Sequence, residues 1–138
     1  MSALSFDIHP IGVVESSLTA RSSAPRQDDE GAPDAWLVLD PFAAPGLDGL
    51  AAGDHIVVLT WFDRADRRVL RTRPRNDARR AAQGVFTTRS PDRPNPVGLH
   101  RVTVLAVDGY RVHVDALDAL DRTPVIDIKP ALGPVADR

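Results

Sequence analysis

Residues 102–117, VTVLAVDGYRVHVDAL, carry the clearest local signal for the fold. Two extended runs rich in β-branched residues flank Asp108-Gly109, and Asp and Gly tolerate the positive φ angles of a two-residue turn. The stretch therefore predicts a β-hairpin whose first strand is apolar on both faces, so we expect one face to meet a second surface. The expected cross-strand pairs are Val107 with Tyr110, Leu105 with Val112 and Thr103 with Val114.

Other short runs rich in β-branched and aromatic residues, bounded by Gly, Pro and Asp, predict further strands. They cover residues 8–14, 35–39, 55–62 and 124–129, with loops expected at 22–34 and 40–54. No sustained helical period accompanies them, and Pro74 interrupts the arginine-rich stretch, which leaves at most a short turn at 77–83. The pattern predicts an all-β fold, a small antiparallel β-barrel with long loops and little helix, formed by residues 1–138 as one domain.

The composition excludes several kinds of site. The chain has no cysteine, which excludes a disulfide scaffold, a thiolate metal site and a cysteine nucleophile, and makes the cytoplasm the expected location. The N-terminal residues contain neither a basic segment nor a long apolar run, so we expect neither secretion nor membrane insertion. Four histidines without paired spacing predict no metal site, and no glycine-rich dinucleotide or phosphate-binding motif is present.

Charge is distributed unevenly along the chain. Residues 64–101 contain eleven arginines and three aspartates, a net charge of +8, whereas the whole chain carries −2 and the remainder therefore −10. Because arginine grips phosphate and carboxylate groups with two parallel hydrogen bonds, this segment favours a nucleic acid or another polyanion as partner. The alternative is a general preference for arginine over lysine, since Lys129 is the single lysine of the sequence.

Residues 84–99, GVFTTRSPDRPNPVGL, form the first candidate binding loop. Its three prolines stiffen the backbone, so its polar side chains are presented with little conformational entropy left to lose on binding. The alternative is a rigid surface crossover with solvated arginines. The polar side chains are those of Thr88, Arg89, Ser90, Arg93 and Asn95.

Residues 117–123, LDALDRT, form the second candidate. Their carboxylates, Asp118 and Asp121, follow the predicted hairpin, and the alternative is a polar connection between strands. Further along, Asp127 and Lys129 share one face of the last predicted strand, so they are expected to form an ion pair.

The two loops, taken together with the residues around them, resemble one known family. GVFTTRSPDRPNPVGL, LDALDRTPVIDIKP, Ile11–Ser16, Pro25-Arg26-Gln27 and the strand IVVLTWF together resemble the TsaA-like, or TrmO-type, S-adenosylmethionine-dependent tRNA N6-methyltransferases. The resemblance covers roughly residues 11–130, and motifs of this length with Pro, Arg, Asn and Asp in fixed order rarely arise by chance.

The resemblance implies a β-barrel that forms a homodimer, binds S-adenosylmethionine without a Rossmann fold and methylates N6 of threonylcarbamoyladenosine beside the tRNA anticodon. It carries catalytic roles to Asp121, Arg93 and Asn95. It carries cofactor binding to Arg26, Gln27, Asp63, Arg64, Arg89, Leu99, His100, Leu120, Asp121, Arg122 and Thr123. Arg89, Arg93 and Asn95 are expected to hold the carboxylate of the cofactor or of the substrate's threonyl group.

Methyl transfer from a sulfonium is an in-line displacement, so the protein mainly positions the reactants and excludes water. Asp121 either orients the cofactor or accepts a proton. Two other functions stay open: the same cofactor with another acceptor, either a different RNA or a small molecule, and a noncatalytic module that binds RNA or cofactor. Salt-dependent tRNA binding without cofactor affinity would favour the module, and cofactor affinity without tRNA binding would favour another acceptor.

Overall fold

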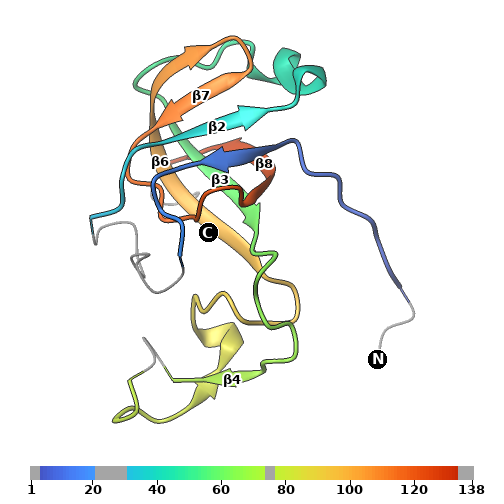
Figure 1. Cartoon of the computed structure of the whole chain (residues 1–138), viewed down its shortest axis with the longest axis vertical. Helices are drawn as coiled ribbons and strands as arrows, with labels where there is room; N and C mark the ends of the chain where they lie inside the picture. Colours follow the sequence, from blue (N-terminus) through green and yellow to red (C-terminus); the bar gives the residue numbers. More distant parts are fainter. Residues whose placement is uncertain (1–3, 21–30, 74–76, 134–138) are drawn as a thin grey trace.

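The computed structural model describes residues 4–20, 31–73 and 77–133. Six antiparallel strands close into a barrel in the order β1-β2-β7-β6-β3-β8, which confirms the predicted all-β fold (Figure 1). The barrel strands are β1 (Gly12–Glu15), β2 (Ala35–Leu39), β3 (His55–Trp61), β6 (Val97–Asp108), β7 (Arg111–Val114) and β8 (Pro124–Pro130).

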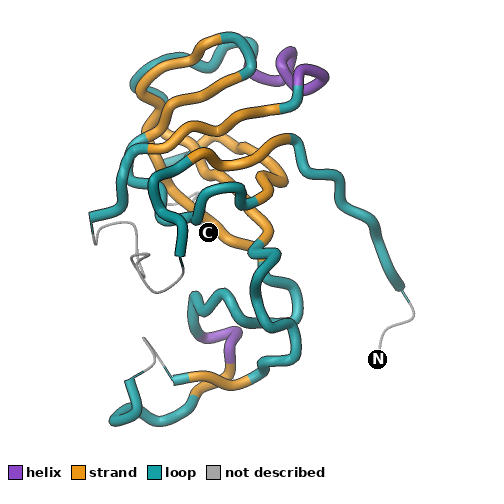
Figure 2. The backbone as a smooth tube through the Cα atoms, in the orientation of Figure 1, coloured by secondary structure: helices purple, strands orange, loops and turns teal. Residues whose placement is uncertain are grey.

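Residues 62–96, which we call the arginine lobe, leave the barrel between β3 and β6 and lie below it in Figure 1. Figure 2 shows how little regular structure they contain. The described residues of the lobe form a two-stranded sheet and one 3₁₀ helix: β4 (Arg71–Thr72), β5 (Gln83–Gly84) and η5 (Val85–Thr87). At its neck the Phe62 amide donates to the Pro96 carbonyl at 2.8 Å, so the outgoing and returning chains are joined where they meet the barrel.

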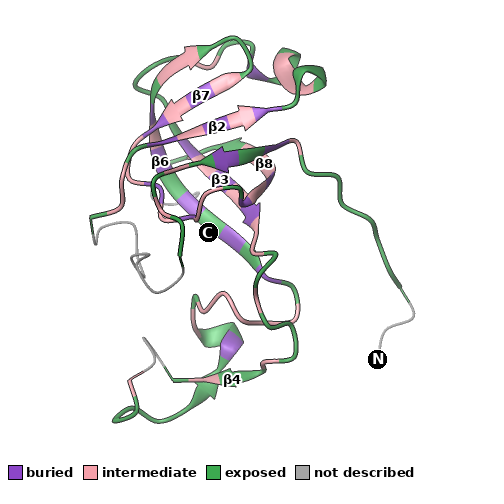
Figure 3. Cartoon of the chain, viewed as in Figure 1, coloured by how far each residue is buried: buried purple, intermediate pink, exposed green. Residues whose placement is uncertain are grey.

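The core lies inside the barrel and consists mainly of Val, Leu and Ile. Burial alternates along the strands, as in β2 and β3, so that one side chain in two points inward (Figure 3). Removing each such side chain from water contributes roughly 1.5–3 kcal/mol, so this packing supplies most of the driving force for the barrel. The buried set includes Val14, Leu37, Leu39, Ile56, Val58, Val102, Val104, Val112, Val114 and Val125.

In the part of the chain that the structure describes, two 3₁₀ helices and the small lobe sheet were not predicted from the sequence. Helix η3 (Pro41–Leu47) lies in the segment predicted as a loop, and its Leu47 side chain packs on the core at one end of the barrel. The short turn predicted at 77–83 is confirmed as a single turn, in which the Arg80 amide donates to the Asp77 carbonyl at 3.0 Å.

The N-terminal strand is shorter than predicted. β1 begins at Gly12 rather than at Ile8, and residues 4–10 run away from the barrel as an extended segment (Figure 1). Pro10 has no N–H to donate to a neighbouring strand, and this explains why the ladder does not continue past Ile11. Going back along the chain toward Pro10, the Ile11 amide is the last that pairs with a neighbouring strand, and it donates to the Val125 carbonyl at 2.8 Å.

The predicted hairpin exists, but its predicted register is wrong. Asp108 pairs with Arg111, so Gly109 and Tyr110 are the two turn residues, and the predicted pair of Val107 with Tyr110 does not form. Gly109 has a φ of 63°, which suits the first central position of a two-residue hairpin turn. Glycine thus took the place that the sequence interpretation gave to aspartate, and Val107 pairs with Val112 instead.

A bulge in β6 changes the faces of the hairpin. The register shifts between Val104 and Ala106, so Val104 stands opposite Val114, and the predicted pairs of Leu105 with Val112 and of Thr103 with Val114 are wrong. The extra residue turns Leu105 outward, where its side chain is 41% exposed. As a result the inward-facing valines of β6 and β7 all point into the same core. Without the bulge, the residues on either side of it would point to opposite faces of the sheet.

We predict that Gly12→Ala destabilises the fold by about 1–3 kcal/mol or more. A Cβ at this position would lie 2.3 Å from the Val38 carbonyl oxygen and 2.6 Å from the Leu39 Cα, and both are backbone atoms that cannot rotate away. The free energy of unfolding from urea denaturation measures the effect. Gly46→Ala is the control, since a Cβ there meets no atom within 4 Å, and equal losses in the two variants would contradict this explanation.

Candidate cofactor site

The turn before β8 is held against the end of β1. The Asp121 carboxylate accepts a hydrogen bond from the Ser16 amide at 3.0 Å, and the Asp121 amide donates to the Leu18 carbonyl at 2.7 Å. These contacts join segments 105 residues apart in the sequence and leave Asp121 half-buried. Its second carboxylate oxygen lies 3.8 Å from the Arg122 guanidinium, so it keeps capacity to accept a further hydrogen bond.

Arg122 occupies an unusual backbone conformation in this turn. Its φ is 70°, in the left-handed region, while its amide donates to the Val14 carbonyl at 2.6 Å. Thr123 is buried, and its carbonyl accepts from the Val14 amide at 2.9 Å, so both residues extend the pairing with β1. The Arg122 side chain is 86% exposed, and the turn therefore presents a cation to solvent beside the Asp121 carboxylate.

A buried polar network links the same region to the barrel interior. His100 is 4% exposed, with Nδ1 at 2.5 Å from the Asp118 carboxylate and Nε2 at 2.8 Å from the Thr60 hydroxyl. An ionised carboxylate can only accept, so Nδ1 carries the proton, and in the neutral imidazole Nε2 accepts from Thr60. Since Thr60 is fully buried, this arrangement orients the segment that follows β7 rather than offering a nucleophile.

Gly98 makes room for this network. A Cβ at Gly98 would lie 2.3 Å from the Thr60 hydroxyl oxygen, 2.5 Å from the Phe62 ring and 2.7 Å from His100 Nε2. The Phe62 and His100 rings meet edge to face, with centroids 5.8 Å apart. Only a glycine therefore lets β3 and β6 carry both the hydrogen bond and the ring contact at this level of the barrel.

The proline-rich loop is organised from within by Arg93. Its Nη2 donates to the carbonyls of Val85 and Thr88, each at 2.5 Å, and its Nε donates to the Ser90 carbonyl at 2.8 Å. These three acceptors lie in the first part of the loop, so Arg93 joins the proline-rich second part of the loop to η5. The catalytic role expected for Arg93 stays a prediction, and the observed contacts make it a positioning residue for the loop.

Asn95 is held by a second arginine. Arg67 donates from Nη2 to the Asn95 side-chain oxygen at 3.1 Å and from Nε to the Pro94 carbonyl at 2.7 Å. The Arg67 guanidinium also lies over the Trp61 ring, 5.1 Å from its centroid. With its oxygen engaged in this way, Asn95 keeps its amide N–H groups for a ligand.

The structure places the expected cofactor residues in two sets. One set is at the end of the barrel, around Asp121 and His100, and the other is exposed on or beside the arginine lobe. Among the described residues no hydrogen bond or ion pair joins the sets, and Arg26 and Gln27 lie outside the described residues. The exposed set consists of Asp63, Arg64, Arg89, Asn95 and, on the outer face of β6, Leu99.

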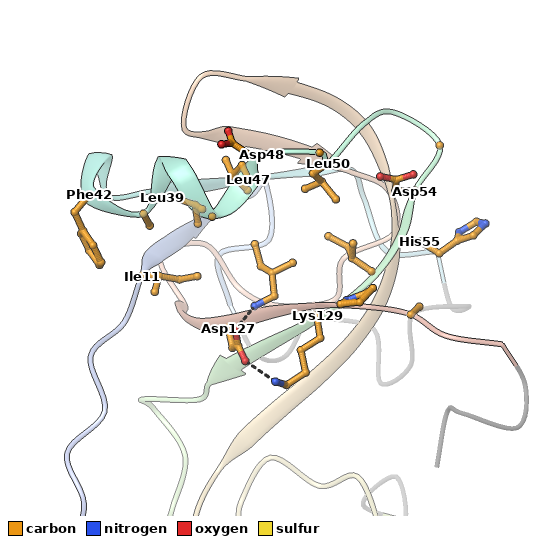
Figure 4. A pocket seen from close by; sticks show the side chains of 18 residues that line it. Ile11, Leu39, Phe42, Leu47, Asp48, Leu50, Asp54, His55, Asp127 and Lys129 are labelled. Atoms are coloured by element: carbon orange, nitrogen blue, oxygen red, sulfur yellow. Dashed lines mark hydrogen bonds and ion pairs between the residues drawn. The ribbon is translucent and has the colours of Figure 1, made fainter.

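A pocket of about 810 Å³ lies at the opposite end of the barrel, under η3 (Figure 4). It contains none of the expected cofactor residues, and we therefore do not assign the cofactor to it. The predicted ion pair of Asp127 and Lys129 lies at its wall with a separation of 3.0 Å, and is confirmed. Within the described ranges, no three His, Cys, Asp or Glu side chains gather to hold a metal ion, and no helix is long and apolar enough to cross a membrane.

Several residues of the site were missed at the level of sequence. Thr60 lies on a predicted strand, and Gly98 lies in the part of β6 that precedes the predicted hairpin. No local sequence pattern indicates that these two residues come close to each other across β3 and β6. Arg67 was one of eleven arginines, and only the fold distinguishes it by its contact with Asn95. Asp118 was a candidate because it is a carboxylate after a hairpin, but its partner His100 lies on another strand.

The sequence of this chain is similar to one protein-family model and to several known proteins. The family model described as the tRNA-methyltransferase O N-terminal domain matches residues 13–137. A protein of Methanothermobacter thermautotrophicus named a probable S-adenosyl-L-methionine-binding protein is 45% identical over 130 residues, covering 94% of this chain and 93% of its own length. An S-adenosyl-L-methionine-binding protein of Archaeoglobus fulgidus is 44% identical over 122 residues, covering 88% and 86%.

A solved structure shares the architecture. The crystal structure of TrmO from Pseudomonas aeruginosa superposes with a TM-score of 0.78 at 31% identity, and the match covers 99% of this chain and 60% of that chain. The present chain therefore spans about 60% of the length of the solved protein.

We predict that Asp118→Ala lowers the free energy of unfolding by about 1–3 kcal/mol, because it leaves the buried His100 Nδ1 without its acceptor. Asp118→Asn keeps an acceptor oxygen and is expected to cost less. Thermal and urea denaturation of both variants measure the difference. An Asp118→Ala protein as stable as the wild type would show that the network contributes nothing to the fold.

Proposed function

Because this chain belongs to the tRNA-methyltransferase O N-terminal domain family, we propose that it transfers a methyl group from S-adenosylmethionine to tRNA. The match of the family model to residues 13–137 carries the proposal. Two relatives named for binding S-adenosylmethionine support the cofactor, and the solved TrmO structure supports the acceptor. We further propose N6 of threonylcarbamoyladenosine beside the anticodon as the methylated atom, and the cytoplasm as the location.

The donor set of the described residues fits this cofactor. S-adenosylmethionine presents a carboxylate, an ammonium group, ribose hydroxyls and an adenine ring. Arg64 and Arg89 are exposed and make no hydrogen bond or ion pair with another described residue, so either guanidinium can pair with a carboxylate. Asp121 supplies an acceptor oxygen for an ammonium or hydroxyl group, and Leu99 and Leu120 supply apolar surface.

When bound, the cofactor supplies an electrophilic methyl group on a sulfonium. The protein's task is then to align the acceptor nitrogen with that carbon and to exclude water. Asp121 is suited to orientation, since the Ser16 amide fixes its carboxylate, and it stands ready to take the proton that the acceptor nitrogen loses. Asn95 lies on the stiff loop that Arg93 braces, and its side-chain N–H groups are the donors that we propose for the threonyl carboxylate of the substrate.

The outer face of the barrel supports a homodimer. Leu59 pairs with Leu99 and Trp61 with Val97 on the outside of β3 and β6, and Leu99 and Val97 are 51% and 43% exposed. An apolar strip on neighbouring strands is typical of a surface that another protein covers. We assign a second copy of the chain to it, related by a two-fold axis so that the same face meets itself.

We expect Arg89→Ala to weaken binding of S-adenosylmethionine by about tenfold to a hundredfold, the cost of a lost charge-assisted hydrogen bond. Isothermal titration of the wild type should give one site per chain. Arg68→Ala is the matched control from the same lobe, because the Arg68 guanidinium is already paired with Asp66 at 3.2 Å. A wild-type protein that binds no S-adenosylmethionine, by titration and by a second method, would refute the cofactor assignment.

Methyl transfer itself is tested with tRNA that carries threonylcarbamoyladenosine, digested and analysed by nucleoside mass spectrometry. The wild type is expected to add one methyl group, Asp121→Ala to lose the activity, and Asp127→Asn, at the other end of the barrel, to retain it. Cofactor binding without transfer to tRNA would indicate another acceptor. Binding of tRNA without cofactor affinity would indicate a noncatalytic module.

For the dimer, light scattering of the wild type is expected to give twice the mass of one chain. Val97→Glu should shift the protein to monomer, since it buries a charge at the proposed interface. Val13→Glu is the control, because Val13 is similarly exposed, at 41%, on β1 away from this strip. A monomeric wild type would exclude the dimer.

A further inference from the structure

Phe86 is an exposed aromatic side chain on the arginine lobe. It lies in η5 and is 80% exposed, whereas its neighbour Val85 is fully buried. We propose that Phe86 is a stacking platform for an unpaired base of an RNA bound to the lobe. The inference rests on the proposed function and deepens it, since it names the surface that holds the RNA.

The backbone that carries Phe86 is firmly anchored. The Val85 amide donates to the Leu70 carbonyl at 3.0 Å, and the Thr88 amide donates to the Val85 carbonyl at 3.1 Å. The Thr87 hydroxyl donates to the Gly84 carbonyl at 2.7 Å, and Arg93 donates to the carbonyls on both sides of Phe86 and Thr87. The ring therefore projects from a fixed turn, so little conformational entropy is lost when a base stacks on it.

Unengaged arginines accompany the ring. Arg71 pairs through its backbone with Gly84, two residues before Phe86, and Arg89 follows three residues after it. Both side chains are exposed and have no hydrogen-bond or ion-pair partner among the described residues. An exposed ring on the same lobe as unpaired arginines combines base stacking with phosphate contacts, the combination by which proteins hold single-stranded nucleic acid.

Other arginines of the lobe are neutralised by neighbouring carboxylates. Arg68 pairs with Asp66 at 3.2 Å and Arg79 with Asp77 at 3.0 Å. The Arg68 backbone N–H and then its guanidinium lower the pKa of Asp66, and the Arg79 guanidinium and then its backbone N–H lower the pKa of Asp77, so both carboxylates are ionised near neutral pH. The lobe thus separates structural arginines from those that remain available to a polyanion.

RNA fits this surface better than a second copy of the chain does. A two-fold dimer through the lobe would place the same arginines opposite one another, and juxtaposed like charges are unfavourable. A polyanion would instead neutralise them and release counterions. Leu70, 59% exposed and joined to Val85 across the small sheet, adds apolar surface to the platform.

Fluorescence anisotropy with full-length tRNA, measured over a series of salt concentrations, tests the proposal. Phe86→Ala is expected to weaken binding about fivefold to a hundredfold with an unchanged salt slope, because stacking releases no counterions. Phe86→Trp should restore the affinity. Arg71→Ala should instead reduce the slope by about 0.7–0.9, the share of one phosphate contact.

Phe42→Ala is the matched control, because Phe42 is also exposed, at 69%, but lies on η3 at the far end of the barrel. It is expected to bind tRNA like the wild type. Wild-type affinity in Phe86→Ala would overturn the inference, and so would a change in its mass by light scattering, which would identify Phe86 as a contact between copies.

These results are separable from those on the proposed function. A wild type that methylates tRNA while Phe86→Ala binds tRNA equally well overturns the stacking platform alone. A wild type that binds no cofactor overturns the proposed function, whereas a Phe86-dependent loss of tRNA binding would still support the platform.

Discussion

Closure of the barrel by β1 is the constraint on which the rest of the structure depends. This four-residue strand pairs with β2 on one side and β8 on the other, so it joins the first and last parts of the sheet. Gly12 permits the close approach, since its α-carbon faces the Val38 carbonyl with no room for a side chain. Where β1 ends, its following amide at Ser16 meets Asp121, and the candidate cofactor turn forms as a direct result.

The long strand β6 connects the chemistry of the lobe with that of the barrel. It begins at the end of the proline-rich loop, carries the buried side chain of His100 and ends at the hairpin turn. The bulge at Leu105 keeps the upper half of the strand in register with β7, while the lower half pairs with β3. One strand therefore supports the loop, the buried network and the outer apolar strip.

The arginines illustrate how one residue type serves different purposes in one segment. Arg93 and Arg67 donate to carbonyl and amide oxygens and so give the proline-rich loop its shape. Arg68 and Arg79 each pair with a nearby aspartate, whereas Arg64, Arg71 and Arg89 make no such contact with the described residues. The net charge of the segment alone does not distinguish these groups, because the distinction depends on which acceptors the fold brings within reach.

The sequence by itself determined the all-β class, the positions of β2, β3 and β8 and the existence of the hairpin, because alternating burial and turn residues are local properties. Its long motifs also indicated the family. Only the tertiary structure decided the hairpin register, the Thr60–His100–Asp118 network and the bracing of the loop by Arg93 and Arg67. In each case the sequence offers several pairing partners for the same residue. Closure of the barrel and exclusion of water from its core select one of them.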